Sequence, residues 1–310
     1  MVMAETESLL TGAIVDWLPP SVADTLARRL GLEAMGQVVP ETFKERSRNA
    51  WFHGHHRGVR VFVKLYAHAP HGVVEQYVGR QLGARYTTEI LLGESVPNLG
   101  WCNVFRWEPV TPLPHTLDSV ETAATLLAMT HRQDPGRADV LSRRQVGERP
   151  YQELLARFGR VAWDVYQEWR DLLDGRDTAS VVREAEQADA ETPGALLHGD
   201  FSLRNVGSGE RGRPVVFDFE RSGLGPTELD LRRIWDRELA AVPGGRETFV
   251  SAYRAARGLT GVWPEPALLR YARLTCALTT ITAARRTDDP QFEQEGRRIL
   301  EDLRAEGTSA

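Results

Sequence analysis

The sequence predicts an α+β fold with two lobes: an N-terminal lobe built on an antiparallel sheet with one helix, and a mainly helical C-terminal lobe. Three observations support this prediction. Short β-rich runs fill much of the first third of the chain, helical periodicity dominates after a Pro-rich stretch at 109–114, and 310 residues are enough for one bilobal unit or two packed domains.

The elements of the N-terminal part can be assigned in order. Residues 21–31 combine a serine cap candidate, apolar residues at helical spacing and a terminal glycine, which predicts a helix. Between Gln37 and Tyr66, β-rich runs separated by a glycine-containing turn predict an antiparallel meander. Residues 72–83 return to helical spacing, and EILLGES and GWCNVFRWE predict two further strands.

The C-terminal part is mainly helical, with two short strands expected around LLHGD and PVVFDFE. The Pro-rich stretch PVTPLP has the composition of a hinge between the lobes. We therefore expect a helical N-terminal extension at 1–36, an N-lobe at 37–110 and a C-lobe at 111–310.

Charge and cysteine content exclude several classes of protein. The formal charge of −5 and the lack of a long basic block argue against nucleic-acid binding and favour a small-molecule partner. Cys102 and Cys276 form neither a metal motif nor a disulfide framework, which favours a reducing cytoplasm. Asp16 and Pro19 interrupt the apolar N-terminal stretch, so we expect neither a signal peptide nor a membrane span.

The strongest signal is LLHGDFSLRNVGSGERGRPVVFDFE, which places His198, Asp200, Asn205 and Asp218 in one predicted strand-loop-strand unit. Phosphoryl transfer from a nucleotide needs a carboxylate near the acceptor hydroxyl and oxygen ligands for the metal that bridges the phosphates. This segment supplies both. A surface hairpin with unrelated turn residues is the alternative, but four such positions rarely coincide by accident.

These residues resemble the aminoglycoside phosphotransferase and choline kinase family, which shares the protein-kinase-like fold. The resemblance spans roughly residues 37–240 and implies that Asp200 is the catalytic base or orients the acceptor. It implies that Asn205 and Asp218 bind Mg²⁺, and that His198 and Asp230 support the catalytic loop.

The resemblance extends to Lys64 in VFVKLY, which corresponds to the lysine that holds the α- and β-phosphates of the nucleotide. Glu75 resembles its ion-pair partner on the following helix. Among 38 basic residues only Lys44 and Lys64 are lysines, so a lysine retained at this position is informative. Glu89 is a competing partner, but its segment fits a strand better than a helix.

Further nucleotide contacts follow from the resemblance. Ser47 and the backbone around Asn49 are expected to face the phosphates of ATP or GTP, and the main chain from Glu108 to Val110 is expected to contact the adenine. The triplet Asp-Phe-Glu replaces the Asp-Phe-Gly of protein kinases, which favours a small acceptor. Glu220 in this triplet could bind the metal or face solvent.

The resemblance implies a cytoplasmic, Mg²⁺-dependent phosphotransferase with an alcohol group as acceptor. The γ-phosphate of ATP or GTP would pass to an antibiotic or related natural product, in antibiotic resistance or self-resistance. Choline, ethanolamine, a sugar or an amino alcohol are alternative acceptors.

Two questions stay open from the residues themselves. Acidic residues in the second half could attract a cationic acceptor or could form a solvated helix face; they include Asp164, Glu168, Asp171 and Asp174. A protein of another class, a nucleotide-binding regulatory protein without turnover, is disfavoured because each residue type that the reaction needs is present.

Overall fold

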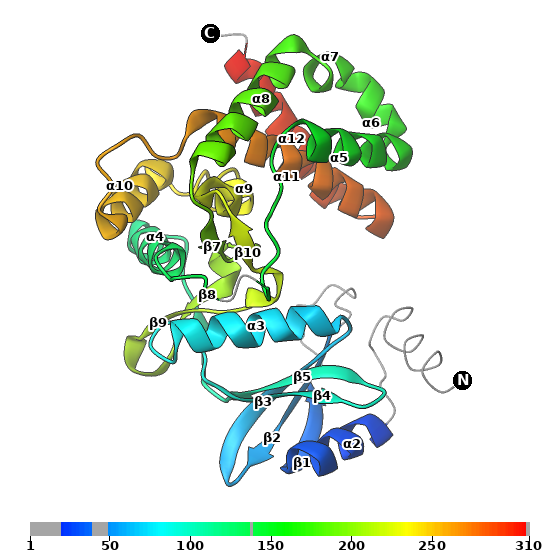
Figure 1. Cartoon of the computed structure of the whole chain (residues 1–310), viewed down its shortest axis with the longest axis vertical. Helices are drawn as coiled ribbons and strands as arrows, with labels where there is room; N and C mark the ends of the chain where they lie inside the picture. Colours follow the sequence, from blue (N-terminus) through cyan, green and yellow to red (C-terminus); the bar gives the residue numbers. More distant parts are fainter. Residues whose placement is uncertain (1–19, 39–48, 137–138, 308–310) are drawn as a thin grey trace. The chain divides into compact units, whose positions relative to one another are not determined.

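The computed structural model describes residues 20–38, 49–136 and 139–307, which divide into two compact units (Figure 1). Unit 1 holds the described residues up to Pro112 together with Asn205–Ser222. Unit 2 holds Leu113–Arg204 and the described residues from Gly223 onward. The chain therefore leaves unit 1, returns for one short segment and leaves again.

The main sheet of unit 1 is antiparallel, and its described strands follow the order β1-β2-β3-β5-β4. The strands of this sheet and the α-helices among the described residues of this unit are α2 (Pro20–Leu30), β1 (Leu32–Val38), β2 (Ala50–His56), β3 (Val59–Tyr66), α3 (Ala69–Leu82), β4 (Ile90–Val96) and β5 (Gly100–Arg106). This order brings β3, which carries Lys64, to the centre of the sheet.

Both faces of the main sheet are covered. Val61, Val63 and Leu65 of β3 are fully buried in one core with residues of α2, including Leu26. Because successive strand residues point to opposite faces, Lys64 points to the other face. Helix α3, drawn in cyan in Figure 1, packs against β5 and β3. The period of two along VRVFVKLY thus separates an apolar face from a face that bears a lysine.

Strand β1 begins earlier than the sequence predicted. The meander was expected from Gln37, but β1 starts at Leu32, directly after α2 and Gly31. Gly31 has a φ of 61°, a conformation that glycine adopts at little cost and that ends the helix within one residue. Leu32 is buried in the same core as Leu26, which explains why this short turn is followed at once by a strand.

The two strands expected around LLHGD and PVVFDFE lie in different sheets. The structure places β7 (Ala195–Leu197) opposite β10 (Gly223–Gly225) in unit 2. In unit 1, β8 (Val206–Ser208) pairs with β9 (Pro214–Val216) and with β6 (Thr111–Pro112). The two expected strands therefore belong to different sheets, because each finds its hydrogen-bonding partner in a strand that the sequence pattern did not reveal.

Unit 2 is mainly helical. Its described helices are α4 (Leu117–His131), α5 (Glu148–Val161), α6 (Trp163–Glu168), α7 (Arg170–Leu173), α8 (Arg176–Glu191), α9 (Leu231–Ile234), α10 (Gly245–Arg257), α11 (Pro266–Thr287) and α12 (Pro290–Gly307). Short 3₁₀ turns accompany them in the two units: η1 (Leu203–Asn205), η2 (Glu210–Gly212), η3 (Phe219–Arg221) and η4 (Thr227–Asp230).

A large core of unit 2 lies around α11, whose apolar residues pack with those of α5, α8 and α12 (Figure 1). Trp169 is buried in this core, whereas Trp163 is exposed. Within the described ranges, none of the helices combines the length and apolar character that a membrane crossing requires. The predicted α+β class, with an antiparallel N-terminal sheet and a mainly helical C-terminal part, is confirmed.

Candidate functional site

Lys64 and Glu75 form a buried ion pair in unit 1. The Lys64 Nζ lies 2.9 Å from Glu75 Oε2, and the two side chains are only 7% and 6% exposed. Helix α3 positions Glu75 over the face of the sheet to which Lys64 points. The competing residue Glu89 is bonded instead to Arg106 at the surface, at 2.5 Å. The structure therefore brings together the pair that the sequence favoured.

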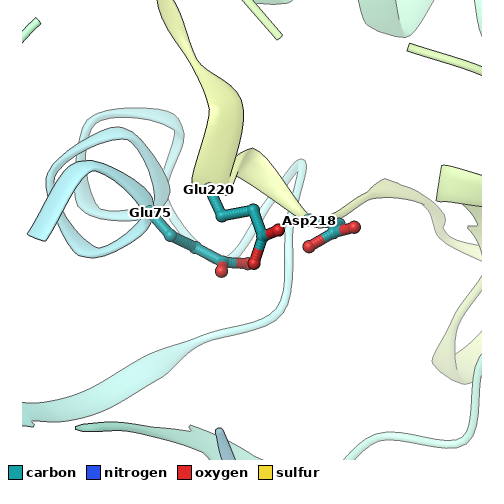
Figure 2. A group of neighbouring side chains, drawn as sticks. All are labelled: Glu75, Asp218 and Glu220. Carbon is teal, nitrogen blue, oxygen red and sulfur yellow. The ribbon is translucent and has the colours of Figure 1, made fainter. Parts of the chain in front are cut away.

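Two more carboxylates contact the same ammonium. Lys64 Nζ lies 2.6 Å from Asp218 Oδ1 and 2.9 Å from Glu220 Oε2. Figure 2 shows the carboxylates of Glu75, Asp218 and Glu220 gathered at one place, and one oxygen of each lies within 4.8 Å of the others. We call these three residues the carboxylate cluster. An ammonium has three N–H donors, so Lys64 can engage one carboxylate with each of them.

The cluster keeps Lys64 charged. Burial lowers the pKa of Lys64, but Glu75, Asp218 and Glu220 raise it by more than burial lowers it. The pKa of Lys64 therefore lies well above its usual value. Burial raises the pKa of Glu75, and Lys64 offsets part of that effect. Two partly exposed carboxylates, Asp218 and Glu220, therefore contact a side chain that stays positively charged. This arrangement suits exchange of the carboxylates at Lys64 for phosphate, and of Lys64 at the carboxylates for a metal ion.

A β-hairpin positions Asp218 and Asn205. Val206 lies opposite Val216, and the Phe217 N–H donates to the Asn205 carbonyl at 3.0 Å. Asp218 then adopts a φ of 70°, in the left-handed region that aspartate tolerates better than most residues. The backbone turns there into η3, which contacts α3 and so places Glu220 beside Glu75.

The oxygen donors of this part of unit 1 suit a hard divalent cation. Asp218 and Glu220 offer carboxylate oxygens, Asn205 offers an amide oxygen, and Mg²⁺ prefers one or two carboxylates completed by phosphate and water. The residues present therefore fit the metal that the resemblance implies. Glu220, left open by the sequence between metal and solvent, has a side chain only 15% exposed that faces Lys64.

Asn49 supports Glu220. Its Nδ2 donates to Glu220 Oε2 at 2.6 Å, and its Oδ1 accepts from the Ala67 N–H at 3.2 Å. The segment expected to cover the phosphates is thus linked through Asn49 to the carboxylate cluster. Ser47, expected at the same place, lies outside the described residues.

Glu108 and Val110 lie against the hairpin that carries Asn205. Glu108 Oε2 accepts from Arg213 Nη2 at 2.5 Å, and its Oε1 accepts from the Glu210 N–H at 2.8 Å. Val110 packs over Gly207, where a Cβ would meet the Val110 Cγ1 at 2.3 Å. The side chain of Glu108 therefore fixes the end of the hairpin, a contact that the sequence pattern did not reveal.

In unit 2, Asp230 holds the backbone of the predicted catalytic loop. Its Oδ2 accepts from the His198 N–H and its Oδ1 from the Gly199 N–H, each at 2.7 Å. Asp230 is 1% exposed. Burial raises its pKa, but the hydrogen bonds from His131 and the loop outweigh burial and lower the pKa below its usual value. The carboxylate is therefore ionised and rigidly bonded.

His131 and Tyr253 extend this network, and the sequence pattern pointed to neither. The Nε2 of His131 lies 2.9 Å from Asp230 Oδ2, and its Nδ1 lies 2.7 Å from the Tyr253 hydroxyl. Tyr253 stacks on Trp263 with ring centroids 3.7 Å apart. The sequence feature that could have indicated this network is the histidine at the end of AMTH, on the buried face of its helix, because a buried histidine needs polar partners.

Asp200 lies on the same loop with its side chain 15% exposed. Its carboxylate contacts the Arg233 Nη1, and its N–H donates to His198 Nδ1 at 3.3 Å. Arg232, next to Arg233, donates to the Gly199 carbonyl. The sequence pattern did not predict these arginines, although LRRIW follows directly after Asp230, which holds the loop.

Solved structures with the same fold include several phosphotransferases. Aminoglycoside phosphotransferase APH(4)-Ia is 14% identical, with 92% of this chain and 97% of that chain covered and a TM-score of 0.65. Spectinomycin phosphotransferase APH(9)-Ia is 11% identical, with coverages of 93% and 99% and a TM-score of 0.60. Choline kinase LicA from Streptococcus pneumoniae is 15% identical, with coverages of 91% and 98% and a TM-score of 0.61.

These likenesses confirm the predicted fold; at such identities they concern the fold alone. No curated protein sequence matches the chain significantly. The model of the phosphotransferase enzyme family matches residues 44–269. Because that match covers well over half of the 310 residues, the chain belongs to the phosphotransferase enzyme family, as the resemblance predicted.

Proposed function

We propose that the protein transfers the γ-phosphoryl group of ATP or GTP to a hydroxyl group of a small molecule. The buried Lys64 that contacts Glu75, Asp218 and Glu220 carries this proposal, because it combines a phosphate-binding cation with metal-binding oxygens. Structures of the same fold were determined with AMP-PNP and hygromycin B, with GDP, and with ADP and spectinomycin, which supports a nucleotide donor.

In the proposed reaction, the residues of unit 1 bind the donor. Lys64 exchanges its contacts with Asp218 and Glu220 for α- and β-phosphate oxygens, while Glu75 keeps it oriented. Asp218, Asn205 and Glu220 would hold Mg²⁺, which supplies charge neutralisation at the β- and γ-phosphates when bound. Main-chain groups between Glu108 and Val110 would contact the base, and Ser47 and Asn49 the phosphate region, as in the prediction from the resemblance.

The residues of unit 2 act on the acceptor. The bond between the γ-phosphorus and the β-phosphate oxygen breaks, and a bond forms between that phosphorus and the acceptor oxygen. The acceptor hydroxyl gives its proton to Asp200, which releases it to water; the products are a nucleoside diphosphate and a phosphate monoester. Asp230 and His198 keep the loop that carries Asp200 in place.

For the acceptor, we infer an antibiotic or related natural product as the first choice, with a sugar, choline, ethanolamine or another amino alcohol as alternatives. The acidic residues that could have attracted a cationic acceptor are largely engaged within the protein. Asp164 pairs with Arg285 at 2.6 Å and Glu168 with Arg297 at 2.5 Å. They therefore give little support to a cationic acceptor and behave as a surface ion-pair network.

Release of ADP or GDP in the presence of Mg²⁺, either donor and a panel of hydroxyl acceptors tests the proposal. Acceptor-dependent release that disappears in Asp200→Asn, with nucleotide binding retained by calorimetry, is the expected result. The isosteric amide keeps the shape of the side chain but accepts no proton. Nucleotide binding without transfer to any acceptor would point instead to a non-catalytic regulatory protein.

Two further expectations belong to this proposal. The boundaries at 1–36, 37–110 and 111–310 assign donor binding to the N-lobe and acceptor binding to the C-lobe. Residues 205–222 of unit 1 carry the proposed metal ligands, so a 37–110 fragment alone should bind Mg²⁺-nucleotide poorly. A cytoplasmic location agrees with the donor, because ATP and GTP are cytoplasmic substrates.

A further inference from the structure

Arginine side chains surround the proposed catalytic carboxylate in unit 2. Arg233 contacts Asp200 directly, and its neighbour Arg232 bonds the Gly199 carbonyl on the same loop. Arg204 follows Asp200 by four residues and is exposed. Together with Arg237, these residues form what we call the arginine cluster: Arg204, Arg232, Arg233 and Arg237.

Arg204 has no hydrogen bond or ion pair with any residue that the structure describes. Arg233, Asp200, Glu238 and Arg237 all lie within electrostatic range of it. A guanidinium that has no direct salt bridge and lies near a second guanidinium is available to bind an incoming anion.

Only part of the arginine cluster is paired with carboxylates. Arg233 contacts Asp200, whereas Arg204 and Arg232 have no ion pair with a described residue. Burial raises the pKa of Glu238, and one of its carboxylate oxygens is buried without a hydrogen-bond partner among the described residues. Glu295 neutralises Arg237 from the far end of that side chain, at 2.8 Å. The guanidinium groups of Arg204 and Arg232 therefore have no direct carboxylate partner among the described residues.

We propose that the arginine cluster selects an acceptor that carries an anionic group, a carboxylate, sulfate or phosphate, close to the hydroxyl that is phosphorylated. This inference rests on the proposed function, since it requires the acceptor hydroxyl to reach Asp200. A hydroxyl bonded to Asp200 lies within range of Arg233 and Arg204, so an adjacent anionic group meets guanidinium donors suited to bidentate binding. A polycationic acceptor would meet repulsion at the same place.

Arg204 is the residue to test, because changing Arg233 would also disturb Asp200. Arg286 is a matched control: it is an exposed arginine of α11 with no hydrogen bond or ion pair to a described residue. Calorimetric titration with sulfate, at constant ionic strength and with saturating AMP-PNP and Mg²⁺, measures the anion site directly. We expect saturable binding to wild type and Arg286→Gln, weakened by about tenfold or more in Arg204→Gln.

A kinetic experiment tests the same site with acceptors. Hydroxyl compounds are compared in matched sets, such as gluconate, glucose and glucosamine, alongside acidic, neutral and basic natural products. We expect acidic acceptors to be preferred by about tenfold or more in kcat/KM, and Arg204→Gln to remove that preference mainly by raising KM.

The outcomes separate this inference from the proposed function. Transfer confined to neutral or amine-bearing acceptors, or sulfate binding that is absent or unchanged in Arg204→Gln, would overturn the anionic acceptor and leave the kinase assignment standing. Sulfate binding through Arg204 without transfer to any acceptor would support the anion site and contradict the proposed function.

Discussion

His131 is expected to stabilise the loop that carries Asp200 through two buried hydrogen bonds, and His131→Phe removes both while nearly conserving shape. Asp230 is ionised and can only accept, so His131 donates from Nε2 and accepts the Tyr253 hydroxyl at Nδ1. Losing a hydrogen bond to a charged group costs about 1.5–3 kcal/mol, and removing the acceptor of the buried Tyr253 hydroxyl proton costs about 1–3 kcal/mol. We therefore expect a loss of about 3–5 kcal/mol in the free energy of unfolding, measured by urea denaturation.

The stability difference between wild type and His131→Phe should also depend on pH. Burial lowers the pKa of His131 in the folded state, and the attraction of Asp230 does not restore it. Below about pH 6.5, the pKa of a histidine in the unfolded chain, the unfolded chain binds a proton at His131 that the folded chain does not. The free energy of unfolding of the wild type therefore decreases as the pH falls. The variant lacks this titration, and the gap between wild type and variant should narrow from about pH 7.5 to about pH 5.5.

Tyr253→Phe serves as the graded control. It leaves the bond to Asp230 intact and removes the hydroxyl alone, so the free energy of unfolding should fall by about 1–2 kcal/mol, less than in His131→Phe. A loss below about 1 kcal/mol in His131→Phe, or a gap that widens on acidification, would refute the reasoning about the buried network.

Three further changes test unit 1. Lys64→Met should weaken Mg²⁺-nucleotide binding about 100-fold by calorimetry, because it removes the proposed phosphate-binding cation; undiminished affinity would contradict that role. Arg213→Gln removes the 2.5 Å ion pair with Glu108 and should lower the free energy of unfolding by about 1 kcal/mol, measured as a lower Tm. Arg211 is exposed on the same turn, so Arg211→Gln should leave the Tm unchanged. Gly207→Ala should cost about 1–3 kcal/mol, since its Cβ would lie 2.3 Å from a Val110 methyl; a Tm equal to wild type would contradict the close packing.

Much of the fold could be predicted because it depends on local patterns. Alternation along VRVFVKLY and helical spacing in the following segment were enough to predict β3 and α3, and β3 indeed turns Lys64 toward α3. The pairing of β7 with β10 could not be predicted. Three-residue strands carry almost no periodicity, and their partners are chosen by long-range hydrogen bonding.

Among the site residues, the motif by itself determined which residues could bind phosphate and metal, since their chemistry is a property of residue type and spacing. Only the tertiary structure decided that Glu220 joins Glu75 and Asp218 around Lys64, and that Arg233 contacts Asp200. Both contacts join residues far apart in the chain, and the free energy of such a contact depends on burial and on neighbouring charges. Local sequence determines the elements and their chemistry, whereas the packing of distant segments decides which charges meet.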